Sequence, residues 1–336
     1  MTCLPPAAPH LGAVIGCTPL VRLPYLSTRT GLTVWAKLEG FNPGGSAKDR
    51  TAAALVEDAC ASGRLRPGGT VVESSSGNLG MALARECCLR GMSFHCVVDP
   101  RTNRYAVSVM EALGATVHRV TEPDPATGDW LAARRNRVRD LLGELPGSVN
   151  LDQYSNQAVF PAHARGTMRE IVEQLGHAPA LLFAAVSTTG TLGGCLDYLR
   201  GTRAATRVTA VDATGSVLYG GRRGERPLPG FGAGVVPELS TQSQPDAVAR
   251  IDAARAVAGA RLVAWREAYL PGASGGAVVV ALLDAASPAD LGARSPENND
   301  AVLIFHDHGY AYLDTVYSDA WVREHLGDPS ELESIL

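Results

Sequence analysis

The sequence predicts an α/β protein of two domains, each a mainly parallel, twisted sheet covered by helices. Three observations support this fold class. Apolar strand-like runs alternate with helical stretches along most of the 336 residues, as in repeated βα units. This length is enough for two ordinary domains. The turn sequence Leu145-Pro-Gly-Ser148 marks a break near residues 145–155.

The expected elements of the first half follow from periodicity and from the residues that end them. Residues 33–38 alternate as a strand does. Apolar residues recur at helical spacing over residues 51–62, and Gly63 ends that helix. Three strand–helix pairs then follow: 70–73 with 79–90, 94–98 with 105–113, and 115–120 with 130–142.

The second half continues the same alternation. Its expected strands are residues 180–186, 207–212, 248–251 and 301–305. Its expected helices are residues 191–200, 253–267 and 275–286. The carboxyl ends of the parallel strands are therefore the places to look for ligand-binding residues.

Composition excludes several classes of function. The formal net charge of −4 gives no basis for binding nucleic acid. No apolar run reaches the roughly 18 residues of a membrane span, and the N-terminus lacks the pattern of a secretion signal. Seven cysteines without a Cys-x-x-Cys pair argue against a disulfide framework and a zinc site, so we expect free thiols in the cytoplasm and no metal.

The choice of basic residues is unusual. Lysines and arginines total 30, yet only Lys37 and Lys48 are lysines. A guanidinium stays protonated, whereas a lysine amine can lose its proton and act as a nucleophile, so the two lysines are candidates for chemistry that needs an amine. Lys37 lies in the middle of an alternating strand, and we expect it to be a solvated charge.

Lys48 has the stronger claim to chemistry. It stands in the segment Asn42-Pro-Gly-Gly-Ser-Ala-Lys48-Asp-Arg50, where a turn follows a strand and leads into a helix. The positive end of that helix disfavours an ammonium, so the pKa of Lys48 should be lowered, as a Schiff-base lysine requires. The alternative is a surface lysine in a turn.

Two further strand-to-helix loops have the composition of anion sites. Ser74-Ser-Ser-Gly-Asn-Leu-Gly80 offers hydroxyl and backbone N–H groups that suit a substrate carboxylate. Ser187-Thr-Thr-Gly-Thr191 has the same design and suits a phosphate. Each could equally be an ordinary capping loop. An activated lysine, a phosphate loop and a carboxylate loop together fit a phosphorylated aldehyde cofactor that acts on amino acids.

At these motifs the chain resembles the cysteine synthase group of pyridoxal-phosphate enzymes, known as fold type II and similar to the tryptophan synthase β subunit. The resemblance runs from about Gly16 to Trp321. It implies a smaller mobile domain at residues 40–150, a larger cofactor-binding domain at 11–39 plus 151–325, an active site in the cleft between them, and a homodimer.

The resemblance also assigns roles to individual residues. Lys48 binds pyridoxal 5'-phosphate as an imine, and Asn78 contacts the phenolic oxygen of the cofactor. Gly272-Ala-Ser274-Gly-Gly276 resembles the segment whose serine pairs with the pyridine nitrogen, which makes Ser274 the candidate. The residues expected to bind the cofactor phosphate are Ser187, Thr188, Thr189, Gly190 and Thr191, and those expected to bind the substrate carboxylate are Ser75, Ser76, Gly77 and Asn78.

Finer features resemble one branch of the group, the diaminopropionate-pathway synthases. Among them are Cys96-Val-Val-Asp-Pro100, Val211-Asp-Ala-Thr-Gly-Ser216 and Pro229-Gly-Phe-Gly-Ala233. This branch joins O-phosphoserine to glutamate, giving N-(2-amino-2-carboxyethyl)-L-glutamate and phosphate for siderophore or peptide-antibiotic biosynthesis. Near the C-terminus, Asp307-His-Gly-Tyr-Ala-Tyr312 departs from the Asp-x-Gly-x-Arg-Tyr common in the group, which leaves the role of this tail open.

Two small-molecule amino-acid substrates with several negative charges need cationic partners. Arg134 is the first candidate, with a solvated helix face as its alternative, and Tyr154 is expected near the leaving group. Three other functions stay open: a cysteine synthase that uses O-acetylserine or O-phosphoserine with sulfide, a β-elimination lyase, and a non-catalytic protein that binds the cofactor.

Overall fold

The computed structural model describes residues 7–285 and 298–336. The chain divides into two compact units. Unit 1 takes Met1–Cys17 and Asn42–Leu151, and unit 2 takes Thr18–Phe41 and Asp152–Leu336. Each unit has its own sheet covered by helices, which confirms the predicted α/β class. The assignment of a mobile role to one part and cofactor binding to the other stays a prediction.

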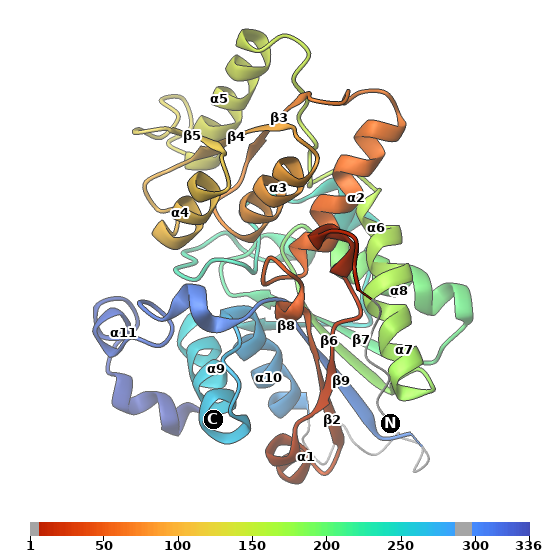
Figure 1. Cartoon of the computed structure of the whole chain (residues 1–336). Helices are drawn as coiled ribbons and strands as arrows, with labels where there is room; N and C mark the ends of the chain where they lie inside the picture. Colours follow the sequence, from red (N-terminus) through yellow and green to blue (C-terminus); the bar gives the residue numbers. More distant parts are fainter. Residues whose placement is uncertain (1–6, 286–297) are drawn as a thin grey trace. The chain divides into compact units, whose positions relative to one another are not determined.

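Unit 1 is built on a three-stranded parallel sheet with the order β3-β4-β5. Its strands are β3 (Thr70–Ser74), β4 (Ser93–Val98) and β5 (Thr116–Arg119). Its helices are α2 (Lys48–Ala61), α3 (Asn78–Leu89), α4 (Arg104–Ala112), α5 (Trp130–Glu144) and the 3-10 helix η1 (Leu11–Val14). Helices α3 and α4 pack on one face of the sheet and α5 on the other (Figure 1).

Unit 2 is built on a six-stranded sheet with the order β1-β2-β9-β6-β7-β8. Its strands are β1 (Leu20–Arg22), β2 (Thr33–Leu38), β6 (Leu181–Ala185), β7 (Arg207–Ala213), β8 (Ala247–Ile251) and β9 (Asp300–Phe305). All neighbouring pairs are parallel except β1 with β2. Its helices are α1 (Pro24–Thr30), α6 (Val159–Ala162), α7 (Arg169–Leu175), α8 (Gly190–Thr202), α9 (Ala253–Glu267), α10 (Ala273–Ala285) and α11 (Asp319–His325).

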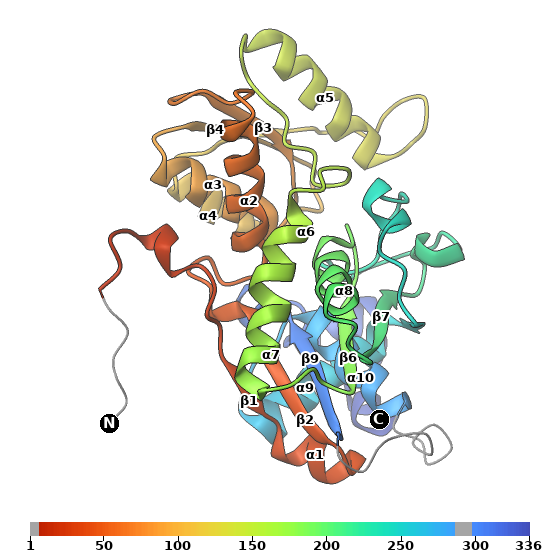
Figure 2. The same ribbon diagram turned by 90° about the vertical axis from the view of Figure 1, so that its right-hand side faces the viewer.

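The large sheet is buried on both faces, as expected for parallel strands. On β6, Phe183 belongs to the apolar cluster of α9 and α10, whereas its neighbours Leu182 and Ala184 belong to the cluster of α7 and α8. Successive side chains of a strand point to opposite faces, so this alternation places one helix layer on each side (Figure 2). Five of the strands are parallel, namely β2, β9, β6, β7 and β8. The loops that follow them therefore lie at one edge of the sheet.

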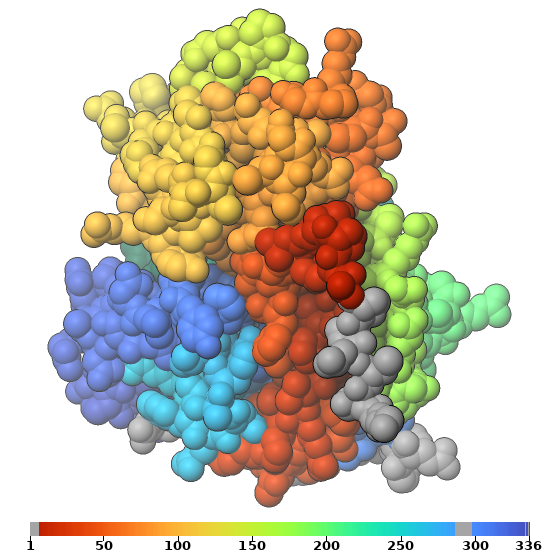
Figure 3. Space-filling model, in the orientation of Figure 1, coloured from red at the N-terminus to blue at the C-terminus, as the bar shows by residue number. Residues whose placement is uncertain are grey.

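Several elements of unit 2 escaped prediction from the sequence. Strand β1, helices α1 and α11, and the stretch from α6 to α7 carry too short a periodic pattern to be recognised. Between α6 and α7 the backbone forms a π-helix, His163–Met168. A C-terminal 3-10 helix, η7 (Pro329–Ile335), packs on α9, and Figure 3 shows the blue C-terminal part of the chain beside the cyan part.

The prediction that Lys37 is a solvated charge is wrong. Its side chain has 0% exposure, and its Nζ atom forms an ion pair with Glu170 at 2.8 Å. Strand β2 lies inside the sheet, and α7 brings its polar residues to this face. The alternation in the sequence identified the strand correctly. It did not show that the Lys37 side chain faces buried Glu170 and not solvent.

Candidate active site

Lys48 is the first residue of α2, where the sequence placed a helix start. The turn before it is closed by a hydrogen bond from the Gly45 N–H to the carbonyl oxygen of Asn42 at 2.8 Å. Gly45 has a φ of +84°, a left-handed conformation that favours glycine. The backbone N–H of Lys48 donates to Oγ of Ser46 at 3.2 Å. The lysine therefore projects from a turn of defined shape.

A buried carboxylate, which the sequence reasoning missed, holds this turn. Oδ2 of Asp49 accepts from the Gly44 N–H at 2.6 Å, and Oδ1 forms an ion pair with Nη1 of Arg85 at 3.3 Å. A Cβ atom on Gly44 would overlap both the Asp49 carboxylate and the Arg85 guanidinium. The shape of the turn before Lys48 thus depends on a glycine and on an ion pair between α2 and α3.

The pKa of Lys48 is lowered to about 8 because burial penalises its charged form. The predicted direction is confirmed, although the cause is desolvation rather than the helix dipole. A lysine amine with this pKa is neutral for a useful fraction of the time near physiological pH, as capture of an aldehyde requires. Among the chain's two lysines, Lys48 therefore has the properties of the reactive one.

Hydrogen bonds of Ser75 hold the loop between β3 and α3 in place. Oγ of the buried Ser75 accepts from the Gly80 N–H at 2.9 Å, and the Ser75 carbonyl oxygen accepts from Sγ of Cys96 at 3.3 Å. Ser76, Gly77 and Asn78 are half-buried, and Asn78 is the first residue of α3. The first N–H groups of a helix have no partner inside it, so this loop can offer donors to a carboxylate.

Arg134 lies at the same edge of the small sheet and not on a solvated helix face. Its side chain is 11% exposed, and its Nε atom lies 3.3 Å from Oδ2 of Asp99, which directly follows β4. Strands β3 and β4 are parallel, with Ser74 opposite Val97, so the loops after them share one edge. Asp99 was not predicted as a site residue.

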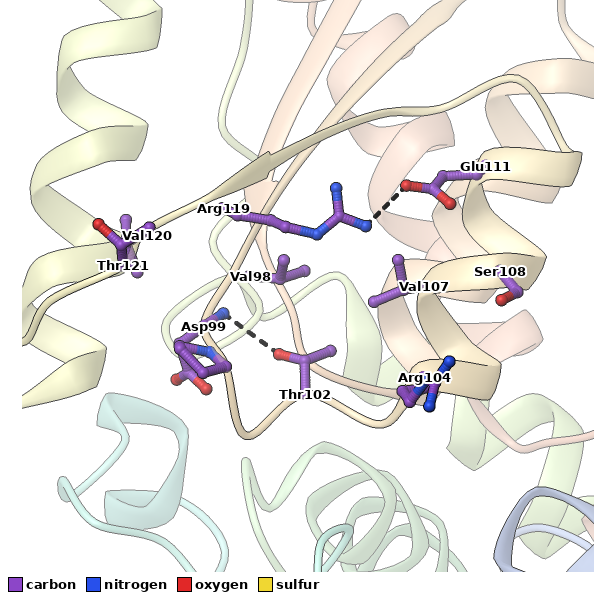
Figure 4. Close-up of a pocket in the computed structure, with 11 residues that line it drawn as sticks. Val98, Asp99, Thr102, Arg104, Val107, Ser108, Glu111, Arg119, Val120 and Thr121 are labelled. Atoms are coloured by element: carbon purple, nitrogen blue, oxygen red, sulfur yellow. Dashed lines mark hydrogen bonds and ion pairs between the residues drawn. The ribbon is translucent and has the colours of Figure 1, made fainter.

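Unit 1 also has a hollow of about 460 Å³ beside this edge. Asp99, Thr102 and the first residues of α4 line one part of it, and an ion pair between Glu111 and Arg119 at 2.8 Å spans another (Figure 4). The residues that line the hollow include none of those predicted for the cofactor or the substrate. This hollow is therefore not the predicted site.

In unit 2, the loop between β6 and α8 has features of a phosphate site. Thr189 adopts a left-handed conformation with φ of +67°, and its buried Oγ1 has no hydrogen-bond partner within residues 7–285 and 298–336. A Cβ atom on Gly190 would lie 2.9 Å from Cγ2 of Val159, so this position leaves no room for a side chain. A hydroxyl without a partner beside a helix N-terminus fits the phosphate of pyridoxal phosphate.

A histidine beneath this loop was not predicted. Nε2 of His163 lies 3.4 Å from Oγ1 of Thr191, and Nδ1 lies 3.1 Å from Oγ1 of Thr167. His163 is fully buried in the π-helix. A single histidine in an apolar stretch carries no sequence signal for such a role. Its contact with Thr191 makes it part of the support for the loop that is predicted to bind phosphate.

Ser274 is the second residue of α10 and is 4% exposed. The segment before it is tied to the tail that departs from the family pattern. The Gly272 N–H donates to the carbonyl oxygen of Asp307 at 3.4 Å, and the Tyr312 hydroxyl donates to Oδ2 of Asp307 at 2.6 Å. The tail therefore supports the segment that holds Ser274 through Asp307, which Tyr312 fixes in place.

Tyr154 lies in unit 2, in a turn that follows Asp152. Its N–H donates to Oδ1 of Asp152 at 3.2 Å, and its carbonyl oxygen accepts from the Leu239 N–H at 3.2 Å. The side chain is half-buried. These contacts fix the backbone of Tyr154, and its place near a leaving group stays a prediction.

Among residues 7–285 and 298–336, no three His, Cys, Asp or Glu side chains are grouped as metal ligands. The six cysteines in these ranges are free thiols. No helix of the described chain is long and apolar enough to cross a membrane.

Comparisons with known proteins agree with this geometry. The family model described as pyridoxal-phosphate dependent enzyme matches residues 12–307. Relatives from Ralstonia nicotianae and Cupriavidus metallidurans, both named N-(2-amino-2-carboxyethyl)-L-glutamate synthase, are 41% and 40% identical over 308 residues, covering 92% of this chain and 89% of each relative. The solved structure of an O-acetylserine dependent cystathionine beta-synthase from Helicobacter pylori matches with a TM-score of 0.83 at 27% identity, over 93% of this chain and 99% of that one.

Proposed function

Because the chain belongs to the pyridoxal-phosphate dependent enzyme family, we propose that it joins O-phospho-L-serine to L-glutamate by β-replacement. The products are N-(2-amino-2-carboxyethyl)-L-glutamate and phosphate, on the way to L-2,3-diaminopropionate for a siderophore or peptide antibiotic. The observation that carries the proposal is the 41% identity, over 92% of the chain, to a relative named for synthesis of that product.

The proposal assigns the contacts of the cofactor to individual residues. Lys48 would hold the aldehyde carbon, Thr189 and its neighbours would bind the phosphate, and Ser274 would pair with the ring nitrogen. When bound, pyridoxal phosphate draws electrons from Cα of the attached amino acid and so permits loss of a group from Cβ. A neutral serine opposite the ring nitrogen suits elimination and replacement.

The residues of the chain then handle protons and charge. Once the amino group of O-phosphoserine has replaced it on the aldehyde carbon, the freed amine of Lys48 would remove the Cα proton of the substrate and later return it. The Cβ–O bond to phosphate would break, and a bond would form from the glutamate nitrogen to Cβ. The proton that this nitrogen loses balances the one that the released phosphate takes up. Ser75, Ser76 and Asn78 bind the carboxylate of the serine-derived part, and Arg134 supplies positive charge to the glutamate. Tyr154 borders the leaving phosphate.

Product mass spectrometry tests the proposal. The purified protein with pyridoxal phosphate is incubated with O-phosphoserine or O-acetylserine, and with glutamate, sulfide or no acceptor. We expect the glutamate adduct from O-phosphoserine, with one phosphate released per adduct, and no product from Lys48→Ala. Cysteine as the main product would favour the cysteine synthase alternative. Pyruvate formed without an acceptor would favour the β-elimination lyase, and no turnover of any donor would leave a non-catalytic protein that binds the cofactor.

We further propose that the protein is a cytoplasmic homodimer. The homodimer follows from the family resemblance, and the six free thiols of the described chain support a reducing compartment. Sedimentation of the purified protein would give the mass of the dimer or overturn it.

A further inference from the structure

Asp99 lies between two arginines at the carboxyl end of β4. Its side chain is 2% exposed. Oδ2 lies 3.3 Å from Nε of Arg134 and 3.0 Å from Nη2 of Arg101, and Oδ1 accepts from the Arg101 N–H at 2.9 Å. A buried carboxylate needs such partners, because a charge taken out of water without a partner is strongly unfavourable. Asp99 is thus an anchor for both guanidinium groups.

The anchor is itself held in place. The Asp99 N–H donates to Oγ1 of Thr102 at 3.2 Å, and the Thr102 N–H donates back to the Asp99 carbonyl oxygen at 3.0 Å (Figure 4). Pro100 follows directly and fixes a backbone angle in this turn. The carboxylate of Asp99 therefore has little freedom to swing away from the arginines.

One carboxylate shared by two guanidinium groups leaves this trio with one net positive charge. Arg101, whose side chain is 63% exposed, is also placed over the ring of Trp130, with Cζ 5.6 Å from the ring centroid. Trp130 and Arg134 are one helical turn apart on α5. The Nε atom of Arg134 forms an ion pair with Asp99 but no hydrogen bond among the described residues, and a guanidinium has further N–H groups at its two terminal nitrogens.

The trio adjoins the predicted carboxylate loop within unit 1. Cys96 of β4 lies three residues before Asp99 in the chain. Its Sγ atom donates to the carbonyl oxygen of Ser75. Burial raises the pKa of Cys96 to about 12, while the charge of nearby Arg134 opposes that rise. Two cationic groups therefore lie at the edge where the serine-derived carboxylate is expected to bind.

We propose that Asp99 is a positioning residue that holds Arg134 and Arg101 as the receptor for the carboxylates of the second substrate. This inference rests on the proposed function, in which the acceptor is a dicarboxylic amino acid. Asp99 itself does not touch the substrate. It sets the orientation of the guanidinium groups and thereby the preference for glutamate over an acceptor without the second carboxylate.

The test compares Asp99→Asn, which keeps size and removes charge, with the rescue variant Asp99→Glu. Asp58→Asn is the matched control, because Asp58 pairs with Arg64 at 2.7 Å on the exposed surface of the same unit. Two readouts are taken from the holoenzyme: the rate of the first phosphate release from O-phosphoserine without acceptor, and KM for glutamate and for glutamine.

We expect Asp99→Asn to raise KM for glutamate by about tenfold or more, because both guanidinium groups lose their buried counter-charge, and to reduce the preference over glutamine. Phosphate release should change by less than about twofold, and so should all constants of Asp58→Asn. Arg134→Ala should raise the glutamate KM similarly, and the double variant should be less than additive.

An unchanged glutamate KM in Asp99→Asn overturns the inference. A first phosphate release that slows by the same factor as the glutamate KM rises also overturns it, because that result indicates a structural role. If the wild-type enzyme forms no glutamate adduct, the proposed function fails, and the inference fails with it. If the adduct forms but the variant keeps its KM, only the role of Asp99 is rejected.

Discussion

Nζ of Lys37 lies 2.8 Å from Oε2 of Glu170 inside unit 2. The same amine donates to the carbonyl oxygen of Thr18 at 2.7 Å and to Oε1 of Gln174 at 3.0 Å. An ammonium has three N–H groups, and each has an acceptor here. Lys37 is therefore committed to structure, which leaves Lys48 as the lysine of this chain suited to covalent chemistry.

Removal of Lys37 should destabilise unit 2. In Lys37→Ala the buried Glu170 carboxylate loses its counter-charge, and we expect the free energy of unfolding to fall by about 3–5 kcal/mol. Urea unfolding followed by circular dichroism measures the change. Arg169→Ala is the control, because Arg169 pairs with Glu173 on the surface at 3.7 Å, and its loss should cost below about 0.5 kcal/mol. Equal losses for the two variants would contradict the structural role of Lys37.

Covalent capture of the cofactor should depend on pH through Lys48. Below a pKa of about 8 most Lys48 amines are protonated and unreactive, and above it most are neutral. We therefore expect the rate at which the apoprotein captures pyridoxal phosphate to rise with pH and level off above about 8. Stopped-flow absorbance measures this rate, and borohydride reduction followed by peptide mapping locates the bond.

A rate that still rises up to the ordinary lysine value of 10.5 would show that burial does not tune this amine. A label on Lys37 would remove Lys48 from the mechanism.

The turn before Lys48 should tolerate no side chain at position 44. In Gly44→Ala the new methyl group displaces the Asp49–Arg85 pair, so Lys48 loses its orientation. We expect cofactor binding to weaken by about 2 kcal/mol, within the usual range for a single disruptive substitution. Spectrophotometric titration of the apoprotein measures the Kd. Gly143→Ala, on open surface of α5, should leave the Kd unchanged, and a similar loss there would point to a general effect of the methyl group.

Thr189 should bind phosphate at a conformational cost. Thr189→Gly removes the left-handed strain together with the hydroxyl, so we expect cofactor affinity to fall about tenfold while the apoprotein stays within about 1 kcal/mol of wild-type stability. Arg203→Gly is the matched control, since Arg203 is exposed and has a φ of +55°. It should stabilise slightly without changing affinity. An unchanged Kd in Thr189→Gly would place the phosphate elsewhere.

Much of the fold was predictable because the residues that end its helices lie next to them in the sequence. Gly63, Gly91 and Gly114 each have positive φ in the turns where helices were expected to end. The predicted strand at residues 180–186 and helix at 191–200 differ from β6 and α8 by one or two residues at most at each end. By contrast, α1 and α7 span seven residues each, too few for a clear period.

The candidate site was predictable only where a short segment carries the chemistry. Lys48, the Ser75 loop and the Thr189 loop each lie on one strand-to-helix connection, so the residue types of a single short segment were enough to suggest them. The Asp49–Arg85 and Asp99–Arg134 pairs join residues more than thirty positions apart, and no local pattern predicts such contacts. Lys37 failed for the same reason, since its partner Glu170 lies 133 residues away.

Helix α6, the π-helix His163–Met168 and helix α7 follow one another without a break. The π-helix changes the rotation of the residues after it relative to the residues before it. In an α-helix, removal of one residue turns everything beyond it by about 100°. Here the wider winding lets His163 meet Thr191 while Ile171, further along, enters the apolar cluster beneath β6. A single-residue deletion in this stretch would force a choice between those two contacts, so the length of the segment constrains the protein as strongly as the identity of its residues.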